Sequence, residues 1–258
     1  MKRFSVILVL VFAVLLMGSK GIIAAEKTFK AIASPFPPFT SPDLENNGLA
    51  WEICKAALET QGYTVTLRFA PWARAMEESK NGRYDGLLPA YWTEERTQWF
   101  LYPMPLVIIH TGFIKRKSRK EIIFAGDLRT LSEYNIGVGK GYSTNDEFDK
   151  ADYLNKVFVP STPQVLKMLW LGHVDLAVGG FEYSSYYLNQ IDREPKFRGI
   201  KDGIVLMKPP LKRRYAYIAI SKKAPDYAKK LRDFNIGMRE IMLDGTYKQI
   251  LGQYGLSG

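Results

Sequence analysis

The stretch GVGKGYST at residues 137–144 combines glycines, a lysine and hydroxyl side chains, which are the residue types that cradle phosphate groups. A P-loop requires four residues between its first glycine and a terminal Gly-Lys-Ser/Thr, and the dinucleotide fingerprint requires the spacing Gly-x-Gly-x-x-Gly. The stretch fits neither pattern, so it gives no reason to expect a nucleotide. We interpret it as a strand that runs into a loop.

Few groups in the chain could transfer protons or attack a substrate. The two histidines are His110, within an apolar strand pattern, and His173, at the predicted end of a helix. Glu52 and Glu182 are the carboxylates to consider for acid–base catalysis, and neither lies in a catalytic motif. No Ser/His/Asp set and no metal-ligand spacing occurs, so we expect no enzyme activity, no cofactor and no metal. The single cysteine, Cys54, has the helical spacing of a core residue.

The composition excludes several classes of protein. Of the 258 residues, 47% are hydrophobic and 24% are charged, which is ordinary for a globular protein and rules out a disordered chain. The formal net charge is +10. An excess of this size, spread along the chain, can attract an anionic ligand or a negative membrane surface as easily as a nucleic acid, and we expect no nucleic-acid partner.

Residues 1–25 have the layout of a secretory signal peptide. Lys2 and Arg3 precede an apolar run from Phe4 to Met17, and Ala24-Ala25 supply small residues for cleavage. The run is shorter than the ~20 apolar residues that span a membrane, and no cysteine beside it could carry a lipid anchor. We therefore expect a periplasmic protein whose mature chain begins near Glu26, with an uncleaved anchor as the alternative. The leader holds three basic residues and no acid, so its removal lowers the net charge to +7.

Beyond the leader, hydrophobic periodicity predicts strands that alternate with helices. The predicted strands cover residues 29–34, 63–70, 84–91, 105–116, 134–140, 156–161, 174–180, 203–207 and 213–221. The predicted helices cover residues 49–61, 71–82, 93–100, 163–171, 182–190, 225–243 and 245–254, and one more begins at the capping box Thr144–Glu147. This alternation indicates an α/β fold with mostly parallel sheets, whose ligands bind beyond the carboxyl ends of the strands. Those ends lead into loops 35–40, 89–96, 141–145 and 179–182.

The ordered motifs resemble those of the periplasmic solute-binding proteins of family 3, which serve ABC importers of polar amino acids. The resemblance begins with FKAIASPFPPFT, NNGLAWEICKAALETQGYTVTLRFAPW and NGRYDGLLPAYWTEERTQWFLYPMPL. It continues with YNIGVGKGYST, LWLGHVDLAVGG and LDGTYKQILGQYG, and so covers essentially the whole mature chain. Its most specific element begins with GRYD. After a spacer of seven residues it continues with Thr-x-x-Arg and then a segment rich in aromatic residues and proline.

The resemblance implies a two-lobed type II periplasmic-binding-protein fold, in which two hinge crossovers let the lobes close on a ligand. It places lobe 1 at residues 26–114 and 212–258, and lobe 2 at residues 115–211. It also implies a monomer that binds a small molecule, an amino acid or a related carboxylate, for import by an ABC permease. Two alternatives stay open: an orphan sensory or accessory protein that works with a membrane receptor, and a cyclohexadienyl-dehydratase-like enzyme on the same scaffold.

The resemblance also implies a set of ligand-binding residues. Arg96 matches the arginine that clamps a ligand carboxylate, a role that suits the planar guanidinium because two parallel hydrogen bonds form. Phe36 and Trp72 match aromatic walls of the site, and Tyr91 lies on the loop beside Arg96. Ser143 lies on the second-lobe loop, where the family offers hydroxyl and N–H groups to the carboxylate.

The sequence departs from the family pattern in the same loops. Pro89 and Tyr91 stand where many amino-acid-binding members have small hydroxyl residues, and Gly180 stands where they carry an aspartate for the ligand's α-ammonium group. Glu182 is the residue that could substitute for that aspartate. We therefore expect recognition of a carboxylate, and recognition of an α-ammonium group only if Glu182 takes this part. We expect Thr144 to act as a helix cap.

Overall fold

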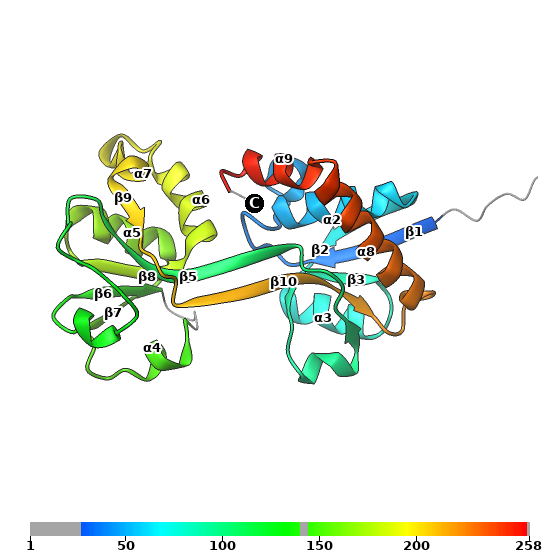
Figure 1. The fold of residues 1–258 in the computed structure, drawn as a ribbon, viewed down its shortest axis with the longest axis horizontal. Helices are drawn as coiled ribbons and strands as arrows, with labels where there is room; N and C mark the ends of the chain where they lie inside the picture. Colours follow the sequence, from blue (N-terminus) through cyan, green and yellow to red (C-terminus); the bar gives the residue numbers. More distant parts are fainter. Residues whose placement is uncertain (1–26, 140–143, 257–258) are drawn as a thin grey trace, which may run out of the picture.

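Two long strands connect two lobes (Figure 1). The computed structural model describes residues 27–139 and 144–256, so the predicted signal peptide lies outside the described residues. Strand β5 (Val107–Arg116) leaves the first lobe and β10 (Lys212–Ser221) returns to it, and the first half of each strand pairs antiparallel with the first half of the other. No helix in the described part of the chain is long and apolar enough to cross a membrane.

Each lobe adds its own strands and helices to this pair. The first lobe contains β1 (Lys27–Ala33), β2 (Tyr63–Phe69), β3 (Gly86–Tyr91), β4 (Phe100–Leu101), α2 (Leu49–Thr60), α3 (Trp72–Lys80), α8 (Tyr227–Leu243), α9 (Thr246–Gln253) and the short turns η1 (Glu45–Asn47) and η2 (Glu95–Gln98). The second contains β6 (Ile136–Gly139), β7 (Lys156–Val159), β8 (Leu176–Gly180), β9 (Ile204–Leu206), α4 (Asp146–Lys150), α5 (Thr162–Leu171), α6 (Phe181–Ile191), α7 (Ile200–Gly203), η3 (Leu128–Leu131) and η4 (Pro195–Phe197).

The strands form one continuous sheet in the order β2-β1-β3-β10-β5-β8-β6-β7. Away from β5 and β10 the pairing is parallel, as the alternation of strands and helices predicts: β1 pairs with β2 and β3, and β6 pairs with β7 and β8. Every pairing of β5 and β10 is antiparallel. The two crossing strands therefore join two parallel sheets into a mixed one.

The apolar side chains gather on both sides of the crossing strands rather than in one mass. The first-lobe core packs β1 and α2 against α8, with fully buried Phe29, Ile53 and Phe234. Cys54 belongs to this core, and burial raises the pKa of its thiol. The second-lobe cores draw their residues from positions 113–207. The lobe boundaries given above stay a prediction.

One expected helix start is wrong. Helix α4 begins at Asp146, and its N-cap is Asn145, whose side-chain oxygen accepts the backbone N–H of Phe148 at 2.8 Å. Thr144, the expected cap, is instead buried, and its own backbone N–H donates to a carboxylate oxygen of Asp149 at 3.3 Å. Asparagine and threonine both cap helices well. Here Asn145, with extended backbone angles, is the residue that caps the helix.

Candidate functional site

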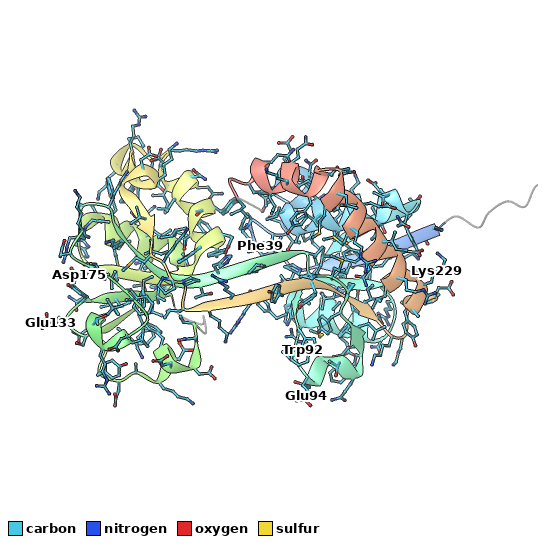
Figure 2. All side chains as sticks on the ribbon, in the orientation of Figure 1. Phe39, Trp92, Glu94, Glu133, Asp175 and Lys229 are labelled. Atoms are coloured by element: carbon cyan, nitrogen blue, oxygen red, sulfur yellow. The ribbon has the colours of Figure 1, made fainter. Side chains whose placement is uncertain are left out.

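Three adjoining cavities lie beside β3, β5 and β10, and the first of them extends to β8 in the second lobe. The first measures about 260 Å³ and is lined from both lobes, the second measures about 340 Å³ and lies on the first lobe, and the third measures about 580 Å³ and follows the start of β10. Tyr91 lines all three, so we treat them as one cleft. Phe39 and Trp92, labelled in Figure 2, line it on either side of the two crossing strands.

Arg96 lies in the second and third cavities and is held in place by the loop that carries it. The Thr93 hydroxyl accepts the backbone N–H of Arg96 at 3.3 Å, which gives the Thr-x-x-Arg spacing a structural reason. The Arg96 guanidinium donates to the backbone carbonyl of Tyr91 at 2.9 Å, and its carbon lies 5.3 Å from the ring centroid of Trp72. A guanidinium has five N–H donors, so the bond to Tyr91 orients it without exhausting it.

Phe36 reaches across the cleft. It lies in a tight turn after β1, in which its backbone N–H donates to the carbonyl of Thr40 at 2.6 Å. Its ring is 5.2 Å from that of Phe39 in the same lobe, and 5.9 Å from the ring of Tyr183 in the second lobe, with 25° between the two planes. A stacked pair thus bridges the two lobes at one edge of the first cavity.

Glu182 is placed apart from this group. Its carboxylate accepts the backbone N–H of His110 at 3.1 Å and lies 2.8 Å from the Nδ1 of the same histidine. Its side chain is 6% exposed, and Glu182 is not among the residues that line the three cavities. Successive residues of a helix point about 100° apart. In the first turn of α6, Glu182 therefore faces β5 while Tyr183 faces the cleft.

The structure thus brings four of the six predicted site residues together: Phe36, Trp72, Tyr91 and Arg96 all line the second cavity. Ser143 lies outside the described residues. Its neighbour Thr144 lines the first cavity together with the hydroxyl-bearing Thr111 and Thr162. Gly180 lines the same cavity, at the position where the family pattern has an aspartate.

Sequence reasoning missed two residues that shape the cleft. Tyr183 follows the predicted loop 179–182 by one position, so a wider window would have included it. Arg214 lies on β10, and its guanidinium carbon is 5.2 Å from the ring centroid of Tyr91. The only feature of the sequence that points to Arg214 is a basic residue within an alternating strand. The alternation does not predict that this strand lies at the cleft.

Burial keeps the phenols of Tyr91, in the cleft, and of its neighbour Tyr102 protonated at neutral pH. Burial raises the pKa of Tyr91, and the positive charge of Arg214 only partly opposes this shift. Burial also raises the pKa of Tyr102, whose hydroxyl donates to the Tyr91 carbonyl at 3.4 Å, to about 12. These hydroxyls are therefore hydrogen-bond donors as well as acceptors.

The lobes, the two crossing strands and the cleft between them define a two-lobed solute-binding protein. The family model for bacterial extracellular solute-binding proteins, family 3, matches residues 30–257. The chain belongs to this family and has the type II periplasmic-binding-protein fold, which confirms the resemblance drawn from the motifs. A search of curated proteins found no match.

Solved structures share the fold at low sequence identity. The L-cystine solute receptor of Neisseria gonorrhoeae, in its unliganded open conformation, is similar over 89% of this chain and 93% of its own, with a TM-score of 0.72 and 17% identity. A histidine kinase sensor domain with similarity to periplasmic binding proteins is similar over 90% and 99%, with a TM-score of 0.61 and 20% identity. An ancestral amino-acid-binding protein, a precursor of cyclohexadienyl dehydratase, is similar over 88% and 94%, with a TM-score of 0.57 and 16% identity.

Proposed function

We propose that this protein binds a small solute with a carboxylate group, an amino acid or a related acid, outside the cytoplasm and delivers it to an ABC-type permease. The observation that carries this proposal is Arg96, held by the Tyr91 carbonyl beside the ring of Trp72, in a first-lobe cavity that adjoins the one lined from both lobes. The guanidinium fork matches a carboxylate with two parallel hydrogen bonds, and the partly buried site strengthens their attraction.

Closure of the lobes follows from the same arrangement. The first cavity takes residues from both lobes, with Phe36 and Tyr91 on one side and Thr144, Thr162 and Tyr183 on the other. A ligand that contacts both sides stabilises the closed form relative to the open one. The crossing strands β5 and β10 are the elements about which such a closure turns.

We further propose that the cleft binds its ligand without catalysis. Among the described residues that line its three cavities, none is an aspartate, a glutamate or a histidine. The remaining titratable side chains are arginine, lysine and tyrosine, and burial raises the pKa of Tyr91 further from neutrality. Proton transfer near pH 7 favours groups with a pKa close to that value.

A ligand screen tests the binding function. The chain from residue 26 onward is unfolded and refolded to remove bound solute, and its melting temperature is measured with amino acids, small carboxylates, polyamines and short sugars. A ligand at 100 times its Kd adds about 2.7 kcal/mol to the free energy of unfolding. We expect stabilisation by acids, and hits among polyamines or sugars alone would contradict the carboxylate assignment.

The likeness to a histidine kinase sensor domain favours a second candidate, in which the ligand-bound form signals to a membrane receptor. Uptake measurements distinguish the two candidates. Deleting the gene abolishes accumulation of the labelled ligand if the protein serves a permease. It leaves accumulation intact, and removes a transcriptional response to the ligand, if the protein is a sensor.

A further inference from the structure

The charges of the cleft all have one sign. Among the described residues that line it, the charged side chains are Arg96, Lys212 and Arg214. The nearby carboxylate of Glu182 is already bound to the backbone and ring of His110. Taking the proposed solute-binding function as given, this distribution specifies which solutes fit.

Arg214 is placed to hold an anion of its own. It lines both the first and the third cavity, next to Lys212, which lines the third. It shares Tyr91 with Arg96: Arg96 bonds to the Tyr91 carbonyl, whereas Arg214 lies over the Tyr91 ring. The two guanidinium groups are therefore separate positive centres, both anchored on the same residue.

An ammonium group finds no carboxylate among the described residues that line the cleft. A buried cation needs a paired carboxylate or the face of an aromatic ring. The rings of Trp72 and Tyr91 already face the guanidinium groups of Arg96 and Arg214. The first turn of α5, whose Thr162 lines the first cavity, holds no acidic residue to offset the positive end of the helix.

We propose that Arg214, supported by Lys212, is a second anion-binding site, and that the ligand is a small compound with two acidic groups joined by an apolar or aromatic stem. Arg96 binds one acidic group and Arg214 binds the other. The stacked rings of Phe36 and Tyr183 cover the stem. A zwitterionic amino acid has an acidic group for only one of the two arginines.

Matched ligands test the proposal by titration calorimetry on the ligand-free chain from residue 26 onward. One series is valerate, glutarate and L-norvaline, and the other is 3-phenylpropionate, phenylsuccinate and L-phenylalanine. Each series compares one acid group, two acid groups and a zwitterion on a similar stem. We expect the diacid to bind best in at least one series, by about tenfold or more over the monoacid.

Variants locate the second site. Arg214→Gln should lower the affinity of the diacid to about that of the monoacid, and should lower the affinity of the monoacid much less. Arg213→Gln, which alters the exposed neighbour on β10, is the matched control and should affect neither. Circular dichroism confirms that both variants fold.

Three results would overturn the proposal: an amino acid that binds as tightly as the diacid, equal effects of the two variants, or no binding by either series at millimolar concentrations. The proposed function fails separately, when the wider ligand screen yields no acid of any kind.

Discussion

The guanidinium of Arg96 donates a hydrogen bond of 2.9 Å to the backbone carbonyl of Tyr91, five residues earlier at the end of β3. The segment that follows β3 thereby fixes the direction of its own arginine before any ligand arrives. An arginine oriented in this way loses less side-chain entropy on binding than a free one. The cleft is therefore partly organised for an anion in the described conformation.

Replacing Arg96 with alanine should weaken binding of an acidic ligand by about 2–5 kcal/mol, because the ligand carboxylate would be buried without its partner. Calorimetry measures the change. Arg239→Ala, an exposed arginine of α8, controls for net charge and should have no effect. Unchanged affinity in Arg96→Ala would remove this residue from the site.

The stacked pair of Phe36 and Tyr183 should couple ligand binding across the lobes. We expect the single variants Phe36→Leu and Tyr183→Leu each to weaken ligand binding. The double variant should lose less binding free energy than the sum of the two single losses. Aromatic pairs are worth about 0.5–1.5 kcal/mol beyond their buried area, which sets the size of the coupling. Tyr186→Leu, on the same helix with its ring against Tyr187, is the control. Additive losses would contradict a direct contact during closure.

Glu182 should support the crossing strand rather than the ligand. Glu182→Ala leaves the backbone N–H of His110 without its acceptor, at a cost of about 1–3 kcal/mol in the free energy of unfolding. Glu182→Gln should cost less, since an amide oxygen still accepts the bond. Urea unfolding measures the stability, with the exposed Glu133→Gln as control. A large loss of ligand affinity with little loss of stability would instead assign Glu182 to the ligand.

The aspartate of the GRYD motif should be structural. Asp85 lies 2.6 Å from the Nζ of Lys230 on α8, and its other oxygen accepts the backbone N–H of Lys30 on β1 at 2.7 Å. Both partners of this ion pair are nearly buried, so Asp85→Ala leaves an unpaired ammonium group and should cost about 3–5 kcal/mol of stability. Asp152→Ala, at an exposed position, is the control. Equal stability of the two variants would contradict this role.

Stability should fall in acid partly through Asp175, labelled in Figure 2. Burial alone would raise the pKa of this carboxyl, but hydrogen bonds from Arg119 and from the backbone N–H of Asn135 outweigh it and lower the pKa. A lowered pKa gives stability that is present above the unfolded value of about 3.9 and is lost as the pH falls below it. In urea unfolding, the free energy of unfolding of Asp175→Asn should therefore be lower than that of the wild type near neutral pH, and the two values should converge at low pH. A difference that stays constant with pH would exclude the linkage.

The sequence predicted the fold well because each element carries its own periodicity. The helix at 49–61 and the strand at 63–70 are confirmed within a residue or so, as α2 and β2. Strand β4, with two residues, was missed because it is too short for any alternation to show. The continuous sheet was also beyond prediction, because pairing between β10 and β3 depends on the whole chain.

The site was predictable only where one loop carries it. Arg96 and Tyr91 lie on the same segment, and their spacing in the sequence already suggests that they meet. Tyr183 and Arg214 join them only through the packing of one lobe against the other and the path of β10. One helical position separates Glu182, which faces β5, from Tyr183, which faces the cleft, and residue types alone do not resolve that difference.

The place of β10 in the sheet has a consequence for the order in which the protein can fold. β10 lies between β3 and β5, although residues 92–211 separate it from β3 along the chain and residues 117–211 separate it from β5. As the polypeptide emerges from its amino end, β1, β2 and β3 are complete while their central neighbour has yet to be made. The edge of β3 that will pair with β10 stays unpaired until residues 117–211 have been synthesised. Contacts of such long range slow folding and prolong the exposure of unpaired strands, so the first-lobe sheet of the newly made chain is complete only once β10 pairs with β3 and β5.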